Sequence, residues 1–209
     1  PMFIMFMLLL IGLMYWKRLS LVIITLVVVL NVFVYMLTPV LWNSLHTYQQ
    51  NRIMTFIDPA RDPLGAGYQI IQAKIAIGSG GCCGKGFLEG TQKNLDFLPE
   101  RHTDFIFSVI GEEFGFIGGM VLLFVYYLFF RRIAQIMQSL EIKEHRYATA
   151  GILGFLAFQV FVNIGMNLGL LPTTGIPLPF ISYGGSSLLI NSIAVGLVLV
   201  FLKEKNFIS

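Results

Sequence analysis

The stretch Leu98-Pro-Glu-Arg-His-Thr-Asp-Phe-Ile-Phe-Ser-Val-Ile-Gly-Glu-Glu-Phe-Gly115 joins a long polar segment to a mainly apolar span over residues 105–130. That span is longer than the ~20 residues that a helix needs to cross a bilayer. Two acids, an arginine and a histidine lie within residues 100–104, immediately before it. Ionisable groups at the edge of a membrane are costly to place, so this group is a candidate functional site.

The composition of the whole chain indicates a helical membrane protein. Of its 209 residues, 56% are hydrophobic and 12% are charged, and the mean hydropathy is +0.77. In soluble domains about a quarter of all residues are charged. Continuous apolar spans that approach or exceed the length of a membrane crossing lie at residues 2–16, 19–42, 105–130, 148–171 and about 187–202. We therefore predict an all-α polytopic membrane protein with about five transmembrane helices, forming a single membrane domain over residues 1–209.

The charge pattern predicts how these spans cross the membrane. The formal net charge is only +3, and its basic residues are divided among loops, so nucleic acid is not an expected partner. Short basic segments follow spans one, three and five: Lys17-Arg18, then Arg131, Arg132, Lys143 and Arg146, then Lys203 and Lys205. The positive-inside rule makes all three cytoplasmic. The loops over residues 43–104 and 172–186 then face outward, and we expect the longer one to be a structured extracytoplasmic loop.

Two parts of the long outer loop carry a recognisable pattern. Residues 68–77 place isoleucines at 70, 71, 75 and 77, which favours a short amphipathic helix lying on the membrane. The glycine-rich stretch Gly78-Ser-Gly-Gly-Cys-Cys-Gly-Lys-Gly86 follows, and glycine suits a tight turn and a binding loop equally well. Ser79 and Gly86 stand where a phosphate-binding loop needs Gly and Ser or Thr, so that motif is excluded. Lys85 could still meet an anionic substrate as a point charge. Cys82 and Cys83 are too few for a zinc site and are interpreted as incidental.

Helical spacing assigns a shared face to the opening stretch. Pro99 suits a first helical position. A helix that begins there would put Glu100, Asp104 and Ser108 on one stripe with the glycines at 111, 115 and 118. Asp104 would lie at the mouth of a glycine-lined groove where another helix can pack closely. Glu112 would lie at the edge of this stripe, and Glu113 would face the other way.

Simpler explanations exist for each of these features. The charges at residues 100–104 can mark a solvated helix end, where the helix dipole favours acids. His102 and Asp104 are too few to specify a metal site. The polar residues of span four, Gln159, Asn163 and Asn167, are spaced for interhelical hydrogen bonds. Ser186 or Ser187 can cap the last span, and the free amides there can bind a phosphate group.

Seven ordered motifs make the chain similar to the SEDS family of peptidoglycan glycosyltransferases. The motifs are Asp62-Pro-Leu-Gly-Ala-Gly-Tyr68, Lys74-Ile-Ala-Ile-Gly-Ser-Gly-Gly81, Gly84-Lys-Gly86, Gly90-Thr-Gln92, Leu98-Pro-Glu-Arg-His-Thr-Asp-Phe105, Gly169-Leu-Leu-Pro-Thr-Thr-Gly-Ile-Pro-Leu-Pro179 and Ser182-Tyr-Gly-Gly-Ser-Ser187. The Gly-Lys-Gly and Pro-Glu-Arg-His-Thr-Asp motifs resemble the elongation (RodA) branch more than the division (FtsW) branch. The resemblance covers the C-terminal half of the family, and the earlier Gln-Pro-Asp-Leu-Gly motif is absent.

The resemblance implies a function and a set of site residues. It implies polymerisation of lipid II during cell elongation and cell-shape maintenance, by a multi-pass protein of the bacterial inner (cytoplasmic) membrane that works with a class B penicillin-binding protein transpeptidase. The catalytic aspartate of the family corresponds to Asp104. We expect Lys85, Glu100, Arg101 and Ser186 to bind substrate, and a divalent cation (Mg or Mn) to share the charge of the leaving pyrophosphate. The apolar groove beside the stripe is expected to hold the polyprenyl tail.

Two other functions compete with this one. A flippase or transporter would move the same lipid-linked precursor, and transporters place their sites near the membrane midplane. The pair Glu112 and Glu113 is the feature that leans toward transport, whereas spans two, four and five have no charged residue in their interiors. A scaffold that only recruits partner proteins would give no reason for an acidic and glycine-rich stripe.

Overall fold

The structure is a computed structural model that describes residues 20–62, 65–90 and 103–208. Within these residues all regular structure is helical: α2 (Leu21–Ser44), α3 (Thr47–Ile57), the short 3₁₀ helix η1 (Pro59–Arg61), α4 (Ala66–Gly80), α6 (Ile106–Ser139), α7 (Lys143–Asn167) and α8 (Gly185–Ile208). The chain divides into two compact units, Pro1–Asn51 and Arg52–Ser209, and each is described by itself.

Four of the described helices are long and apolar enough to cross a membrane. They match the predicted spans at 19–42, 105–130, 148–171 and 187–202, whereas the predicted span at 2–16 lies outside the described residues. α2, in the first unit, buries none of its apolar window against protein, although an 18-residue window of it has a mean hydropathy of 2.0. The all-α polytopic fold is therefore confirmed for the described part of the chain, because surfaces this apolar need lipid or further protein to cover them.

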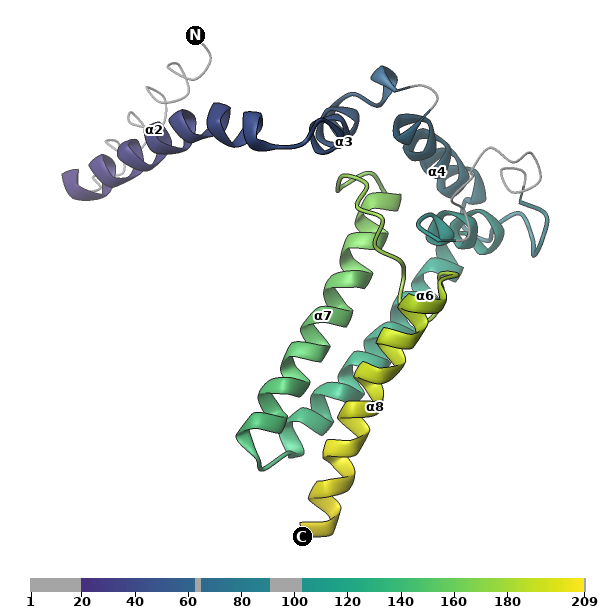
Figure 1. The fold of residues 1–209 in the computed structure, drawn as a ribbon. Coiled ribbons are helices and arrows are strands. Elements are labelled where there is room, and N and C mark those ends of the chain that lie inside the picture. Colours follow the sequence, from purple (N-terminus) through teal and green to yellow (C-terminus); the bar gives the residue numbers. More distant parts are fainter. Residues whose placement is uncertain (1–19, 63–64, 91–102, 209) are drawn as a thin grey trace. The chain divides into compact units, whose positions relative to one another are not determined.

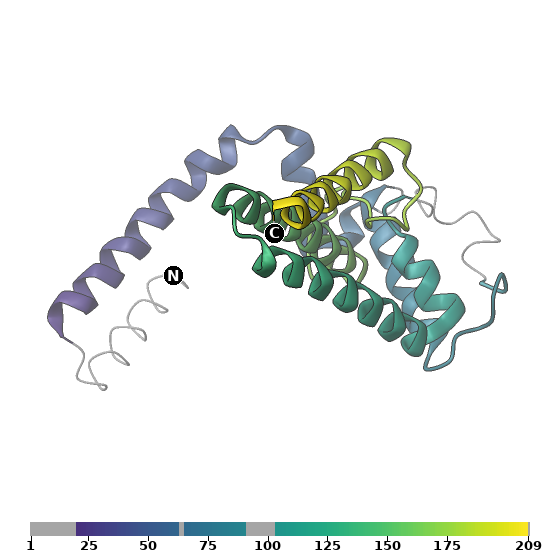
Figure 2. The ribbon, with the colours of Figure 1, turned by 90° about the horizontal axis from the view of Figure 1, so that it is seen from below.

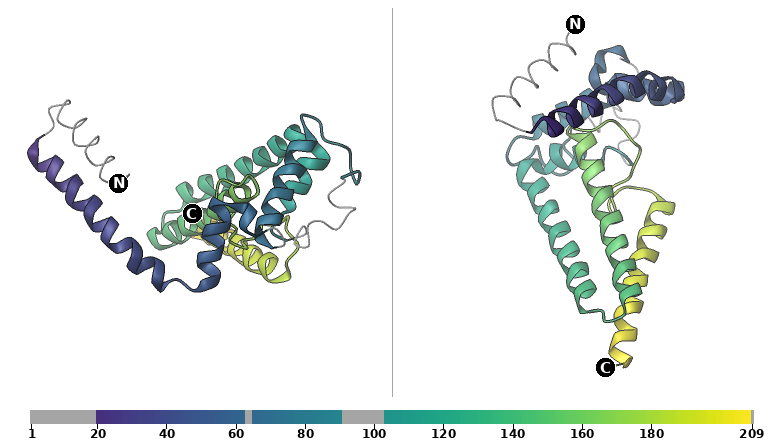
Figure 3. Two further views of the ribbon diagram at one scale, coloured as in Figure 1. Left: turned by 90° about the horizontal axis from the view of Figure 1, so that it is seen from above. Right: turned by 90° about the vertical axis from the view of Figure 1, so that its left-hand side faces the viewer.

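In the second unit, α6, α7 and α8 pack against one another as a bundle (Figure 1). Two further directions of view show the same three helices as neighbours (Figures 2 and 3). Their common core joins Ile133 and Ile136 of α6 to Leu156 of α7 and Val198 of α8. This core fixes the end of the bundle where the predicted cytoplasmic basic residues lie. There the ring of His145 stacks on Phe201 at a centroid distance of 4.2 Å.

The long outer loop is structured, as predicted. Residues 68–77 belong to α4, which packs chiefly on α6. The helix is confirmed, but the isoleucines do not share one face: Ile70 is buried, while Ile71 and Ile75 are exposed. That the exposed isoleucines lie on the membrane stays a prediction. α4 and α6 approach very closely where Gly80 meets Gly111: a Cβ atom on Gly80 would lie 2.0 Å from the Gly111 carbonyl oxygen. Glycine is therefore required at this crossing.

α6 is broken near its N-terminal end. Gly115 has φ 65° and ψ −161°, so two helical segments meet there at a kink. Figure 1 shows the change of direction at the upper end of α6. The prediction of a single helical stripe from Glu100 to Gly118 is therefore wrong at Gly115, because helical spacing does not continue through a non-helical residue. Glu100 lies outside the described residues.

Candidate active site

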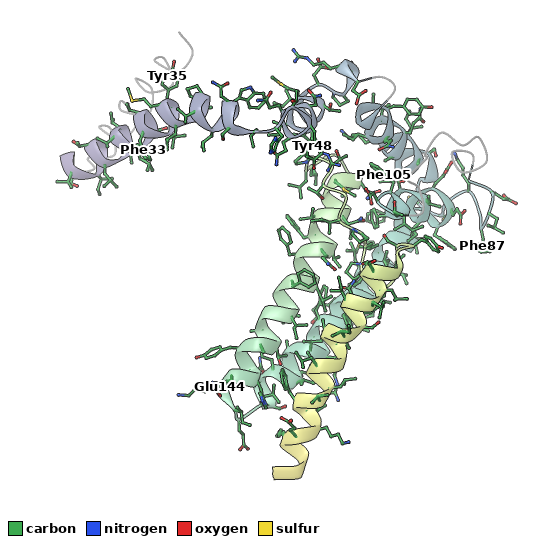
Figure 4. The ribbon with its side chains drawn as sticks, in the orientation of Figure 1. Phe33, Tyr35, Tyr48, Phe87, Phe105 and Glu144 are labelled. Atoms are coloured by element: carbon green, nitrogen blue, oxygen red, sulfur yellow. The ribbon has the colours of Figure 1, made fainter. Side chains whose placement is uncertain are left out.

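Asp104 lies in a turn immediately before α6, and its side chain is half-buried. The predicted helix start at Pro99 lies outside the described residues, but α6 begins only at Ile106, so Asp104 is not part of a helical face. The next residue, Phe105, is 2% exposed and packs with Ala73 of α4. Figure 4 shows Phe105 at the junction of α4 and α6. This anchor places Asp104 at the end of the bundle opposite the basic α6–α7 connection.

Two buried asparagines of α7 hold the backbone at Asp104. The Nδ2 groups of Asn163 and Asn167 each donate a hydrogen bond of 3.0 Å to the Asp104 carbonyl oxygen. The Oδ1 atom of Asn167 accepts the Ser108 N–H at 3.1 Å, so α7 caps the first turn of α6 in place of a local side chain. Both asparagines are 0% exposed. The predicted interhelical hydrogen bonds of span four are thus confirmed for these two residues.

The loop between α7 and α8 closes over the same turn. Ser182 donates from Oγ to the Thr103 carbonyl and accepts the Leu178 N–H at 2.8 Å. Tyr126 of α6 donates to the Pro179 carbonyl at 2.6 Å, which ties the loop to the bundle. Gly175 has φ 75°, and a Cβ atom there would lie 3.6 Å from Oδ2 of Asp104. The Asp104 carboxylate therefore faces this loop at a position where a glycine leaves room.

Sequence reasoning missed Ser182 as part of the site. It belongs to a quoted motif, yet a serine among prolines and glycines carries no spacing signal of its own. Only the fold brings it, across 79 positions of sequence, to the residue before Asp104.

The glycine-rich stretch is a turn that inserts into the break of α6. Lys85 and Gly86 donate their N–H groups to the carbonyls of Glu112 and Glu113 at 3.0 and 3.1 Å. The carbonyls of Gly81 and Cys82 accept the N–H groups of Phe116 and Ile117 at 2.9 and 3.1 Å. An unbroken α-helix would have paired Glu112 with Phe116 and Glu113 with Ile117 directly. The turn therefore satisfies all four backbone groups that the kink releases. The sequence left a tight turn and a binding loop open for the glycine-rich stretch, and the structure shows a turn.

The buried acids lie at this break. Glu112 is 1% exposed, and its Oε1 lies 2.7 Å from Nζ of Lys85. Glu113 is also buried, at 4% exposure. Its burial has a physical reason: the loop folds back so that a Cβ atom on Gly90 would lie 3.0 Å from Oε2 of Glu112 and 3.5 Å from Cγ of Glu113.

Of the other predicted substrate-binding residues, the structure describes Lys85 and Ser186. Glu100 and Arg101 lie outside the described residues. Lys85 lies at the other end of the first segment of α6, which at 1.5 Å per residue is roughly 12 Å away. Ser186 is exposed in the first turn of α8. α8 begins at Gly185, so the prediction that Ser186 or Ser187 caps it is wrong. Ser187 instead accepts a hydrogen bond from Asn191 at 3.3 Å.

An apolar cavity lies beside the break, between α4, α6 and α7. Its volume is about 380 Å³. It is lined by Ile77, Gly78, Gly81, Phe107, Gly111, Gly115, Phe116, Gly119, Met120, Leu123, Ile164 and Leu168. This volume is in the range of ordinary ligand pockets, so it can take a section of a hydrocarbon chain.

The described residues do not form a metal centre on their own. Among them no group of three His, Cys, Asp or Glu side chains lies close enough to hold an ion. At the Asp104 turn they offer one carboxylate, which is fewer donors than a dedicated cation site uses. The expected divalent cation thus stays a prediction.

Comparison with known proteins decides the family. The profile of the FtsW/RodA/SpoVE cell cycle proteins matches residues 1–206. The chain belongs to this family. Within it, the chain is 49% identical over 172 residues to the peptidoglycan glycosyltransferase MrdB of Escherichia coli K12, covering 82% of this chain and 46% of MrdB. It is 47% identical over 155 residues to the peptidoglycan glycosyltransferase RodA of Treponema pallidum, covering 74% of this chain and 36% of that protein.

Solved structures of family members have the same fold. A structure described as the coordination of polymerization and crosslinking by a peptidoglycan synthase complex matches with a TM-score of 0.63 and 38% identity. The match covers 87% of this FtsW/RodA/SpoVE chain and 49% of the other. A crystal structure of an Asp-to-Ala mutant of Thermus thermophilus RodA matches with a TM-score of 0.50 and 40% identity, over 58% of this chain and 38% of that one. The chain thus spans at most about half the length of these relatives.

Proposed function

We propose that this chain is the Asp104-bearing part of a peptidoglycan glycosyltransferase that polymerises lipid II during cell elongation. The observation that carries the proposal is that the backbone around Asp104 is fixed by side chains from elsewhere in the chain. Asn163 and Asn167 of α7 and Ser182 of the loop before α8 all donate hydrogen bonds to backbone carbonyls of this turn. A solvated helix end would not need three buried or half-buried polar side chains to fix it. Support for the reaction class comes from the family members named as peptidoglycan glycosyltransferases.

In the proposed reaction Asp104 acts as the general base. A sugar hydroxyl of one lipid-linked disaccharide attacks the anomeric carbon of another, and its proton passes to the Asp104 carboxylate. The new C–O bond forms as the bond to undecaprenyl pyrophosphate breaks. The fixed backbone stabilises this step by keeping the carboxylate within reach of the hydroxyl rather than by making new contacts. The apolar cavity beside the break is suited to a section of the polyprenyl tail.

Charge on the departing pyrophosphate must be offset by cations. Arg101 and a divalent cation are the proposed contributors, with Glu100 and Ser186 as further substrate contacts. Polymerisation measured with and without a chelator, and with Mn or Mg restored, tests the cation.

The proposed setting is the bacterial inner membrane, with a class B penicillin-binding protein as partner. This follows the solved relative that is described as a peptidoglycan synthase complex for polymerization and crosslinking. Failure to co-purify with such a partner from membranes would contradict the partnership.

The decisive experiment replaces Asp104. We would join this chain to the N-terminal part of MrdB, because the chain spans about half of that relative, and assay the chimera with labelled lipid II. Asp104→Asn should lower polymerisation by roughly 10²–10⁴-fold, the usual contribution of a general base. The matched control is Asp58→Asn, an exposed acid that pairs only with its neighbour Arg61 at 3.4 Å. It should stay within about twofold of the parent, since exposed ion pairs contribute little. Normal polymerisation by Asp104→Asn at equal expression would contradict the assignment.

The transport alternative rests on the broken helix and its buried acids, features that transporters place at the midplane. We infer a different depth for these acids. The predicted span ends before Arg131, so from Gly115 to Phe130 there are about 16 residues, or roughly 24 Å of helix, against a hydrocarbon core of ~30 Å. With Arg131 at the cytoplasmic edge, Glu112 and Glu113 lie well past the midplane and close to the outer edge, which favours chemistry at the interface over transport.

A further inference from the structure

The first segment of α6, residues 106–114, is held at both of its ends. At the front, α7 and the loop before α8 bind the turn that carries Asp104. At the rear, the turn over residues 81–86 makes four backbone hydrogen bonds across the kink. A helical segment this short is unstable in isolation, so its direction depends on these two attachments.

Among the described residues, the rear attachment includes a charged pair between Lys85 and Glu112. Lys85 reaches Glu112 at 2.7 Å with its side chain 29% exposed, whereas Glu112 is 1% exposed. The backbone N–H of the same lysine binds the carbonyl of the same glutamate at 3.0 Å. Lys85 thus binds Glu112 through both its side chain and its backbone. Its ammonium group lowers the cost of burying the Glu112 carboxylate.

We propose that Lys85 is a positioning residue for Asp104 and does not bind substrate. By neutralising Glu112 it keeps the turn inserted in the break of α6, and this fixes the direction of the segment whose front end carries Asp104. The inference rests on the proposed function, because Asp104 is the group that is positioned. It replaces the sequence-based expectation that Lys85 meets an anionic substrate.

The two roles of Lys85 predict different behaviour when Glu112 is also changed. Removing one partner of a buried ion pair leaves an uncompensated charge, whereas removing both is often tolerated. A lysine that neutralises Glu112 becomes dispensable once Glu112 is uncharged. A lysine that binds pyrophosphate stays essential whatever residue 112 is.

The test uses Lys85→Met, Lys85→Arg, Glu112→Gln and the double variant Lys85→Met/Glu112→Gln in the MrdB chimera with labelled lipid II. We expect Lys85→Met to lower kcat about tenfold or more with KM nearly unchanged, because misplacing a catalytic group affects the transition state more than binding. The double variant should recover to within about threefold of Glu112→Gln alone, since residue 112 then carries no charge that needs the Lys85 ammonium group. Lys85→Arg, which keeps the charge, should retain most of the activity.

A raised KM in Lys85→Met, or a double variant as weak as Lys85→Met, would overturn the inference. If Lys85→Met does not fold, the double variant still decides: recovery of both folding and kcat supports positioning, and folding without kcat contradicts it. The unsubstituted chimera and Asp104→Asn are measured in parallel. An inactive parent contradicts the proposed function, whereas an active parent without rescue contradicts only the role of Lys85.

Discussion

Asp104 is fixed through its backbone, and the side chains that fix it are asparagines for a chemical reason. Asn167 donates to the Asp104 carbonyl from Nδ2 and accepts the Ser108 N–H at Oδ1. Only an amide offers a donor and an acceptor on one short planar group. An aspartate in its place would lose the donor and add a buried charge, which is costly.

Asn167→Ala should therefore damage both stability and rate. It removes one hydrogen bond from the Ser108 N–H, which keeps the Phe105 carbonyl at 3.1 Å, and one from the Asp104 carbonyl, which keeps Asn163. At about 0.5–1.5 kcal/mol for each lost hydrogen bond, the unfolding free energy should fall by about 1–3 kcal/mol. Thermal unfolding of the purified chimera, together with kcat for lipid II, measures the two effects. Asn31→Ala is the control, because Asn31 bonds only the Val27 carbonyl of its own helix. Equal behaviour of the two variants would show that the Asn167 contacts do not hold the site.

At the scale of the element, the break in α6 depends on a glycine that the inserted turn demands. Gly115 adopts φ 65°, a conformation that L side chains rarely take. A Cβ atom there would also lie 2.4 Å from the Gly84 nitrogen and 2.7 Å from the Cys82 carbonyl oxygen. The close approach of two backbones and the unusual dihedral angle are both consequences of fitting the turn into the helix.

Gly115→Ala should expel the turn. At φ 65° and ψ −161° the backbone is in a region that is essentially restricted to glycine, and the strain costs about 1–3 kcal/mol before the clash with the turn is counted. We expect a clear fall in the unfolding temperature and loss of polymerisation, measured on the chimera. Gly196→Ala is the matched control, because a Cβ atom on Gly196 in α8 meets nothing within 4 Å. Alanine favours a helix interior over glycine, so this control should be neutral or slightly stabilising. A Gly115→Ala variant as stable as the control would contradict the tight fit of the turn.

At the scale of the whole molecule, the second unit has two chemically different ends. The Asp104 turn, the inserted turn and the loop before α8 lie at one end of the bundle, and the basic α6–α7 connection lies at the other. Figure 4 shows Glu144, near the start of α7, far along the bundle from Phe105. Placing the basic end in the cytoplasm puts the proposed chemistry on the outer face of the membrane.

Thiol labelling in intact cells checks this orientation. Cys82 and Cys83 are both exposed on the inserted turn, so a membrane-impermeant maleimide should label them from outside. Tyr147, 69% exposed near the start of α7, provides the opposite marker. Tyr147→Cys in a Cys82→Ser/Cys83→Ser background should react only after the cells are permeabilised. The reverse pattern would invert the topology and place Asp104 on the cytoplasmic side.

The sequence by itself determined the membrane spans, the predicted side of the membrane for each loop, and the candidacy of Asp104. Apolar length is a local property, so four predicted spans correspond to α2, α6, α7 and α8. Amide spacing is local too, and it pointed correctly to Asn163 and Asn167 as residues that bond other elements. The ordered motifs carried the family, which the profile match to residues 1–206 confirms.

Only the tertiary structure decided the break in α6, the burial of Glu113, and the pairing of Lys85 with Glu112. The sequence around Gly115 has the pattern of a continuous helix and gives no sign of the kink. The four hydrogen bonds that compensate the kink come from a turn about 30 positions earlier in the chain. Helical periodicity describes a helix that satisfies its own backbone. Where another segment supplies those hydrogen bonds, only the long-range contact determines where the helix bends and which side chains it buries.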